Sequence, residues 1–300
     1  MVEKFVELFI LVVMGVIAFK SHLINSNSLK GLSNLLLFIV SPAVILNSYQ
    51  MEYTAELFHG LMWAIVASAL SFFVMIAASN LFISKKSPEY HVEKLASIYS
   101  NCGFVGIPII SGVLGNMGIF YITVYVAMFN IFVWTHGVFV MEKRASKISF
   151  YKNLLSPAII AVIVGILMFI NQIHLPMVIS EPIRFLGDMN TPLAMIVAGA
   201  NIAQTNVLEI FKKKRVYYVS ILRLVVFPCI TAAVLMLFPI TFETRLSIWV
   251  AAACPTGTTA IMFSERYGKN AKYASEIFVI TTILSMITIP LISMVLMKIF

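Results

Sequence analysis

Ten runs of about 20 apolar residues follow one another along this chain of 300 residues, and they constrain its fold more than any other feature. A run of this length crosses a bilayer as an α-helix. The runs are continuous rather than alternating, which excludes the strands of a membrane β-barrel. The sequence therefore predicts an all-α polytopic membrane protein. The ten predicted spans are Phe5–Phe19, Leu32–Tyr49, Leu57–Ile83, Val92–Leu114, Met117–Met141, Leu154–Ile170, Pro182–Ala203, Val216–Ile240, Arg245–Phe263 and Tyr273–Ile299.

The composition agrees with this prediction and excludes two other classes of protein. The chain is 60% hydrophobic and 11% charged, whereas a soluble domain is about 25% charged. Its 23 Phe and 11 Tyr exclude a disordered chain, which would be poor in aromatic residues. The three cysteines have no metal-ligand spacing, so no metal site is predicted.

The basic residues indicate how the spans are oriented. With ten spans, sixteen Lys and Arg residues fall on one side of the membrane and four on the other, and Arg223 lies inside a span. Cytoplasmic loops carry such an excess. We therefore expect both termini outside and the central loop inside, in a cell membrane of bacterial or archaeal type. The net charge of +8 is then a topology signal rather than a sign of nucleic-acid binding, and Lys212–Arg215 is either part of that signal or an anionic-lipid site.

The chain divides into two halves with matching interruptions. The polar segment Glu142–Asn153 separates residues 1–150 from residues 151–300, with five spans each. Because five is odd, the second half is inverted relative to the first, as in many secondary transporters. Ser41-Pro42 in the second span corresponds to Thr191-Pro192 in the seventh. Asn101–Pro108 and Cys254–Thr259 interrupt the fourth and ninth spans.

The fourth and ninth spans are therefore predicted to be broken helices that cross. Gly and Pro at this density do not support a continuous helix, and unpaired backbone groups at membrane depth occur only inside protein or beside a cavity. Half-helix N-termini offer N–H groups and a positive dipole end to an anion. The predicted substrate-binding residues at the breaks are Asn101, Gly103, Pro108, Pro255, Thr256, Gly257 and Thr258. Ser41 and Asn47 in the second span are candidates to complete the site, although Asn47 suits a structural hydrogen bond between helices slightly better.

Several segments resemble the auxin efflux carrier family, which includes the plant PIN carriers and bacterial malate or malonate permease-like proteins. The most specific are SNCGFVGIPIISGVLGNMG (Ser100–Gly118), CPTGTTAIMFSERYG (Cys254–Gly268) and ITTILSMITIP (Ile280–Pro290). SPAVILNS (Ser41–Ser48) and LGDMNTPLAMIVAGANIA (Leu186–Ala203) also fit. The resemblance implies ten helices in a 5+5 inverted repeat, similar to sodium/proton antiporters and bile-acid transporters. It further implies a scaffold of spans 1, 2, 6 and 7 and a mobile transport domain of spans 3–5 and 8–10.

The same resemblance implies a function and a partner. The family moves organic anions, and its plant members form homodimers through the scaffold helices. Asn130 matches the position of a substrate-contacting amide in the plant carriers, although an Asn there also suits an interhelical hydrogen bond. The short central loop departs from the long plant carriers and resembles bacterial or archaeal members. This departure puts auxin in doubt as the substrate.

Charged residues at membrane depth are candidates for gating or coupling. Arg223 either attracts the anion or pairs with an acid, and the candidate partners are Asp188, Glu265 and Glu276. A coupling proton on one of these acids, or Na⁺ on unwound carbonyls, is possible in principle. No other cofactor is predicted.

The predicted function is secondary transport of a small organic anion such as malate, malonate or an auxin-like acid, by elevator-type alternating access. A cation-coupled symporter of bile-acid-transporter type is the first alternative, and a passive channel is another. An intramembrane enzyme is the least favoured class. An aspartyl protease needs two Asp residues, and Asp188 is the only one in the chain. The zinc motif H-E-x-x-H is also missing from the sequence.

Overall fold

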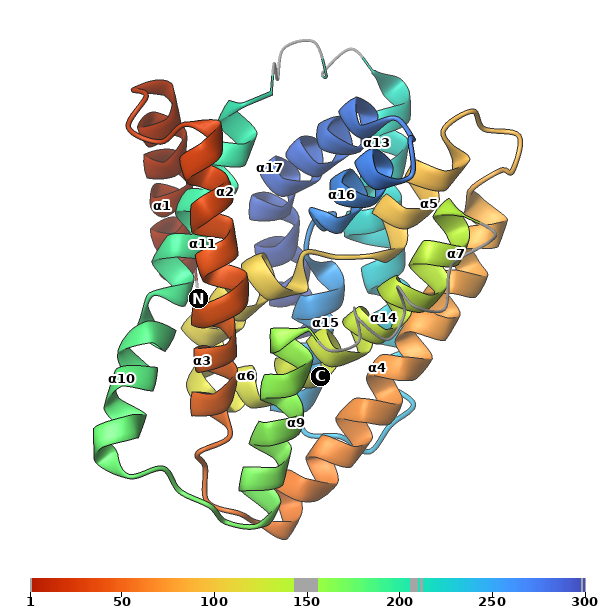
Figure 1. Ribbon diagram of the computed structural model, residues 1–300. Helices are drawn as coiled ribbons and strands as arrows, with labels where there is room; N and C mark the ends of the chain where they lie inside the picture. The colour runs from red at the N-terminus through yellow and green to blue at the C-terminus, as the bar shows by residue number, and fades with distance from the viewer. Residues whose placement is uncertain (1, 143–155, 206–209, 211–212, 298, 300) are drawn as a thin grey trace.

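The computed structural model describes residues 2–142, 156–205, 210, 213–297 and 299, and within them the fold is helical (Figure 1). The first half contains α1 (Val2–Lys20), α2 (Ser26–Leu35), η1 (Leu36–Val40), α3 (Ser41–Ser48), α4 (Ala55–Phe82), α5 (Tyr90–Ile98), η2 (Cys102–Gly106), α6 (Ile107–Phe132), η3 (Val133–Gly137) and α7 (Val138–Met141), where η marks a π-helical turn. The second half contains α9 (Pro157–Ile170), α10 (Met177–Asp188), α11 (Asn190–Ala203), α13 (Lys214–Ile221), η4 (Leu222–Val226), α14 (Phe227–Leu235), α15 (Phe242–Ala253), α16 (Thr259–Arg266) and α17 (Ala271–Leu296).

The helix boundaries follow the predicted spans with three informative differences. The seventh begins earlier, at Met177, and is interrupted at Met189 between α10 and α11. The eighth ends earlier, at Leu235. The end of the fourth span and most of the fifth lie within one element, α6, but Gly115 has a φ of 58° and divides it at the predicted boundary. Glycine adopts this left-handed conformation without the steric cost that a Cβ would add.

The structure confirms an all-helical protein suited to a membrane, while the exact 5+5 arrangement stays a prediction. By length and composition, five continuous helical segments of the described chain are able to cross a bilayer. They are Ser26–Ser48, Ala55–Phe82, Cys102–Met141, Lys214–Leu235 and Ala271–Leu296. The other predicted spans do not form a continuous apolar helix long enough to cross a bilayer, for three reasons. The helix is broken after α5 and after α15, and α9 is short. In α1, acidic and basic residues interrupt the apolar run.

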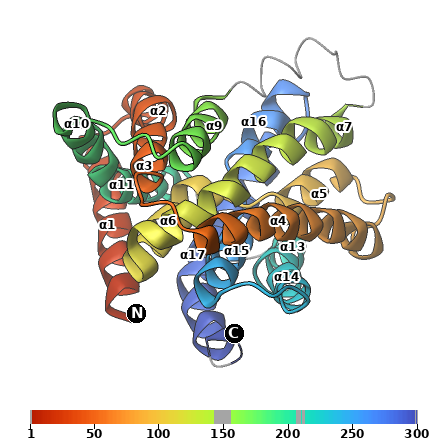
Figure 2. The same ribbon diagram turned by 90° about the horizontal axis from the view of Figure 1, so that it is seen from below.

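The helices gather in two groups that Figure 2 shows side by side, with α1, α2, α3, α9, α10 and α11 in one and the remaining helices in the other. Within the first group α1 packs on α11, and α3 packs on both α9 and α10. The contact of α1 with α11 is very close, because a Cβ on Gly199 would collide with the backbone of Val12 and one on Gly15 with that of Ile196. These two glycines therefore set the spacing between the helices.

The contacts in this group are reciprocal between the two halves of the chain. The first span of the first half, α1, packs on the second span of the other half, of which α11 is part. The first span of the second half, α9, packs in the same way on α3. Gly165 of α9 lies against Tyr49, much as Gly15 of α1 lies against α11. Equivalent elements thus make equivalent contacts.

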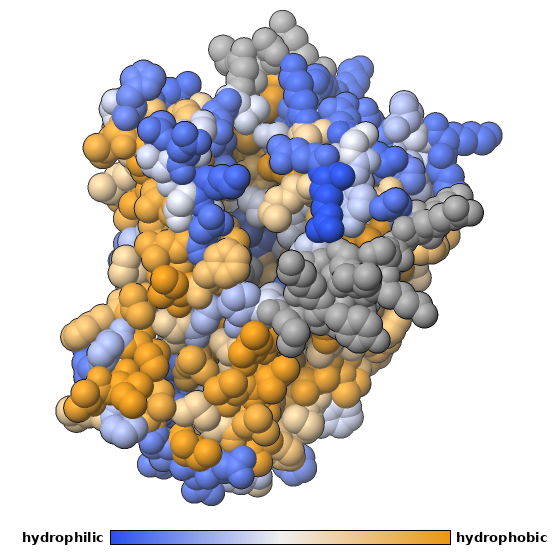
Figure 3. Space-filling view, in the orientation of Figure 1, coloured by the Kyte–Doolittle hydropathy of each residue, from blue (hydrophilic) through white to orange (hydrophobic). Residues whose placement is uncertain are grey.

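Polar connections that carry basic residues gather at one end of the molecule. The α1–α2 turn, the α4–α5 loop, the start of α13 and the α16–α17 turn all lie at the top of Figure 1, and the α3–α4, α9–α10 and α14–α15 connections lie at the bottom. Figure 3 shows hydrophilic residues concentrated at that top end and hydrophobic residues over much of the surface below. The central loop from residue 143 to 155 lies outside the described residues.

Candidate functional site

The two predicted helix breaks are present, and they meet. The chain leaves α5 at Ile98 and is extended before η2, and it leaves α15 at Ala253 before α16 begins. Ser100 and Thr256 form an antiparallel bridge between the two extended segments. The Asn101 N–H donates to the Pro255 carbonyl at 2.7 Å, and the Gly257 N–H donates to the Tyr99 carbonyl at 2.9 Å. Each break therefore satisfies backbone groups that the other leaves unpaired.

Thr256 ties this crossing to the helices around it. Its hydroxyl donates to the Ala96 carbonyl of α5 at 2.9 Å, and its N–H donates to the Thr281 hydroxyl of α17 at 3.1 Å. Thr281 in turn donates to the Ile277 carbonyl at 2.7 Å. Thr256 is fully buried. In this arrangement it holds the crossing together, and contact with a substrate stays a prediction.

Two glycines at the breaks have opposite surroundings. A Cβ on Gly257 would lie 3.0 Å from the Thr259 hydroxyl and 3.1 Å from the Ser100 carbonyl oxygen, so the close approach of the two segments favours glycine there. A Cβ on Gly103 would meet no atom within 4 Å. Open space therefore adjoins the backbone at the start of η2, where a bound molecule can approach it.

The helices that follow the breaks begin without side-chain caps. Asn101 is the N-cap of η2, which continues into α6, and Thr258 is the N-cap of α16, yet neither side chain bonds to the first turn. Asn and Thr are favoured capping residues, so their failure to cap is notable. In the described part of the chain, the buried hydroxyl oxygens of Ser100 and Thr259 also have no hydrogen-bond partner. At α16 backbone groups act instead of a side-chain cap, because the Ala260 and Ile261 N–H groups donate to the Gly257 and Thr258 carbonyls at 3.0 Å. The start of η2 is therefore the better candidate to offer N–H groups to an anion.

Arg223 lies at the other ends of the same broken helices. It is fully buried in η4, where its Nη1 donates to the carbonyls of Ser97 and Ile98 at 2.9 and 2.8 Å, and its Nε donates to the Cys254 carbonyl at 3.0 Å. The partners found are backbone carbonyls rather than an acidic side chain. Asp188 contacts Arg184 at 3.4 Å on an exposed surface, Glu276 pairs with Lys213 at 2.7 Å, and Glu265 is exposed on α16.

A second pair of interruptions meets in the other helix group. Ser41 at the start of α3 and Asn190 at the start of α11 are both buried, and the Ser41 hydroxyl lies 3.5 Å from Asn190 Oδ1. The Nδ2 of Asn190 has no partner in the described part of the chain. Asn190 is not among the site residues predicted from the sequence, although its place directly before Thr191-Pro192 was a usable signal. Asn47 is half-buried further along α3.

The remaining predicted site residues have other local roles. The Asn130 Nδ2 donates to the Val126 carbonyl of its own helix at 2.8 Å, so the bond found is within one helix. Pro108 is buried at the second residue of α6, directly after the π-helical turn η2. Neither contact brings the residue to the crossing.

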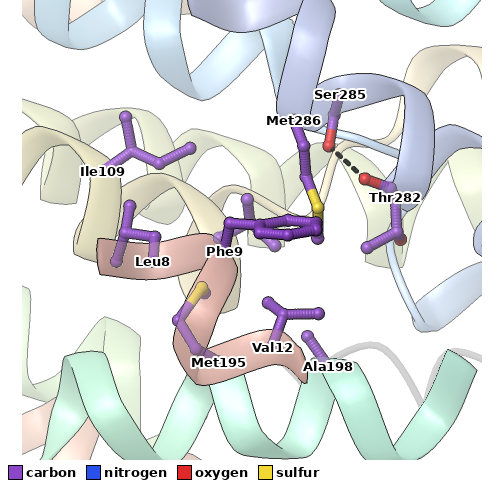
Figure 4. A pocket seen from close by; sticks show the side chains of 10 residues that line it. Leu8, Phe9, Val12, Ile109, Met195, Ala198, Thr282, Ser285 and Met286 are labelled. Carbon is purple, nitrogen blue, oxygen red and sulfur yellow. Dashed lines mark hydrogen bonds between the residues drawn. The ribbon is translucent and has the colours of Figure 1, made fainter. Parts of the chain in front are cut away.

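A small cavity lies between the two helix groups, lined by residues of α1, α11, α17 and the segment after the first break (Figure 4). Its volume is about 30 Å³, enough for about one or two water molecules. The lining includes Phe9, Val12, Met195 and Met286, and the Ser285 hydroxyl is already bonded to the Thr282 carbonyl at 2.7 Å. The cavity is too small and too apolar for an organic acid, and we do not assign it as the substrate site.

A polar pocket of about 470 Å³ opens at the basic end of the molecule. Its charged lining is balanced, with Lys86 and Arg215 facing Glu89 and Glu93. Arg215 pairs with Glu93 and Lys213 pairs with Glu276. Two basic residues of the Lys212–Arg215 run therefore form ion pairs within the protein. Lys212 lies outside the described residues.

Comparison with protein families decides the general class. The model of the membrane transport protein family, to which the auxin efflux carriers and their PIN-like relatives are assigned, matches residues 1–152 and 146–293. The chain belongs to this family. The family model thus matches two successive segments of the chain, which overlap at residues 146–152. No match was found among curated proteins.

Family membership confirms the resemblance drawn from Ser100–Gly118 and Cys254–Gly268. Together with the apolar helices it identifies a membrane-embedded transporter rather than an enzyme.

Proposed function

We propose that this protein is a secondary transporter that moves a small organic anion across the cell membrane. The observation that carries the proposal is the pair of uncapped helix starts at Asn101 and Thr258, on either side of the Ser100–Thr256 bridge. A carboxylate near these ends accepts hydrogen bonds from backbone N–H groups and lies at two positive dipole ends. Gly103 provides space for it beside the backbone.

The binding site in this proposal contains the residues at the breaks, with Ser41 and Asn47 approaching from the other helix group. Asn190 is added to the proposed site because it is buried with Ser41 and has a donor without a partner in the described part of the chain. Asn130 stays a candidate for a further hydrogen bond to a carboxylate. The substrates we propose are carboxylates such as malate, malonate or an auxin-like acid.

The transport mechanism proposed is alternating access by an elevator movement. Spans 1, 2, 6 and 7 form the scaffold, and spans 3–5 and 8–10 carry the substrate. The reciprocal packing of α1 on α11 and of α9 on α3 supports this division, because these contacts lie within the proposed scaffold. The bonds at the crossing join α5, α15 and α17, all within the proposed moving part.

We propose further that both termini face outside, that the basic end lies in the cytoplasm, and that the protein forms a homodimer through its scaffold. The gathering of basic connections at one end supports the orientation. Thiol labelling of single cysteines introduced in the α3–α4 and α16–α17 connections of intact cells tests it. Cross-linking between copies of α10 tests the dimer.

Uptake by purified protein in liposomes tests the function. We expect accumulation of a labelled mono- or dicarboxylate that saturates with concentration and is competed by the unlabelled acid. Conduction far faster than carrier turnover would favour a channel instead. If no carboxylate is carried, the proposed function is wrong. Variants at Asn101 and Gly103, compared with Gly31→Ala on the exposed surface of α2, then locate the site.

A further inference from the structure

Arg223 contributes a buried positive charge at the crossing. Its guanidinium donates three hydrogen bonds to backbone carbonyls, two at the last turn of α5 and one at Cys254, which directly follows α15. Side-chain carboxylates are not among these acceptors. Burying an unpaired charge costs several kcal/mol, so these carbonyls must compensate for its lost hydration.

The carbonyls are suited to that task because they belong to helix C-termini. Each helix end carries roughly half a unit of negative charge on carbonyls that lack an intrahelical partner. Two such ends converge on Arg223, so their combined charge of roughly one unit matches the single charge of the guanidinium. The helices that follow begin at Asn101 and Thr258 without a side-chain cap, and at α16 the Ala260 and Ile261 N–H groups donate to the Gly257 and Thr258 carbonyls.

Unwound carbonyls at broken helices are also the groups with which transporters coordinate a Na⁺ ion. Here the carbonyls of Ser97, Ile98 and Cys254 are occupied by an ion that is covalently part of the chain. A dissociable cation at the same place would have to displace the guanidinium or approach it closely, and like charges repel strongly where water is excluded.

We propose that Arg223 is a built-in counter-cation of the crossing, which neutralises the C-terminal ends of α5 and α15 so that an anion binds at the opposite ends without a metal cation. This inference rests on the proposed anion transport and adds that the transport needs no metal cation. Arg223 acts as a positioning residue, because it touches the two broken helices rather than the substrate. The carbonyl cluster and its cation move together with the proposed transport domain.

Thermal unfolding of the purified protein without substrate gives the first test. The melting temperature is measured in NaCl, KCl and N-methylglucamine chloride at equal ionic strength. We expect the three values to coincide from 1 to 100 mM salt. A melting temperature that rises with Na⁺ alone and saturates would overturn the proposal, since it would show a Na⁺ site that stabilises the native protein.

Chemical rescue separates the charge of Arg223 from its packing. Arg223→Ala is expected to lower the melting temperature, and millimolar methylguanidinium is expected to restore part of the loss in a saturable manner. Arg184→Ala, which removes an exposed arginine, is the matched control and should show no response. The melting temperature of Arg223→Lys should lie between those of the wild type and Arg223→Ala. Equal stability of Arg223→Lys and Arg223→Ala, with no rescue, would contradict the proposal.

Even if Arg223→Ala does not fold, the melting temperatures of the wild type in the three salts test whether a Na⁺ site exists. A failure of this proposal is distinguishable from a failure of the proposed function. Carboxylate uptake that requires Na⁺ would refute the role of Arg223 and leave anion transport intact. Absence of uptake with every acid would refute the function, whatever the effect of Na⁺ on stability.

Discussion

The Glu93 carboxylate and the Arg215 guanidinium form a two-point ion pair that joins α5 to α13, with N–O distances of 2.6 and 2.8 Å. The Tyr273 hydroxyl of α17 donates to the same carboxylate at 3.2 Å. Glu93 is buried, whereas the side chain of Arg215 is 45% exposed. One carboxylate thus links three helices at the basic end of the molecule.

Replacing Glu93 by Gln should lower the free energy of unfolding by about 1–2 kcal/mol. This loss lies between those measured for breaking exposed and buried ion pairs, because the half-exposed Arg215 regains part of its hydration. Thermal or denaturant unfolding in detergent measures the loss. Glu181→Gln, which breaks an exposed pair with Arg184, serves as the control and should have little effect. Equal effects of the two variants would show that Glu93 does not link the helices.

Thr256→Val should weaken the crossing, because it removes the hydroxyl that bonds to the Ala96 carbonyl while preserving the shape of the side chain. A buried carbonyl left without its donor costs about 1–3 kcal/mol. Thr256→Ser keeps the hydroxyl and should retain most of the stability. Unfolding temperatures and carboxylate uptake of the two variants are compared, and identical behaviour would mean that the hydroxyl is unimportant.

Alanine at Gly257 and at Gly103 should have different consequences. Gly257→Ala places a Cβ against the Ser100 carbonyl and should lower stability and uptake together, since overpacking costs about 1–3 kcal/mol. Gly103→Ala adds a methyl group to open space and should leave the unfolding temperature unchanged. If the substrate lies there, its apparent affinity should fall by about tenfold, or about 1.4 kcal/mol. Unchanged affinity in Gly103→Ala would place the substrate elsewhere.

Gly199→Ala should force α11 away from α1, because the new Cβ would collide with the Val12 backbone. We expect a loss of about 1–3 kcal/mol, measured by unfolding in detergent. Gly31→Ala is the control, since nothing lies within 4 Å of its Cβ position on α2, and alanine favours a helix by up to about 1 kcal/mol. A Gly199→Ala protein as stable as the wild type would be incompatible with the close packing of these helices.

Local patterns in the chain were enough to predict much of the fold. The long apolar runs predicted helices, and the Gly and Pro residues at Asn101–Pro108 and Cys254–Thr259 predicted where two of them break. These features depend on neighbouring residues, through side-chain hydrophobicity and the missing N–H of proline. The predicted boundary between the fourth and fifth spans lies at Gly115, where the absence of a Cβ allows a positive φ.

Contacts between distant residues were decided only by the tertiary structure. The sequence offered Asp188, Glu265 and Glu276 as partners of Arg223, because a buried charge is expected to meet an opposite one. In the folded chain, backbone carbonyls at two helix C-termini accept the hydrogen bonds of Arg223. The partial negative charge of a helix C-terminus belongs to the backbone, so the residue types do not reveal it. Asn190 was missed for a related reason, since its burial beside Ser41 depends on how α3 meets α11. The sequence by itself determined a helical membrane transporter with two broken spans, because apolar runs and helix-breaking residues act locally. Tertiary packing decided that the carbonyls at the ends of α5 and α15, rather than an acidic side chain, surround Arg223.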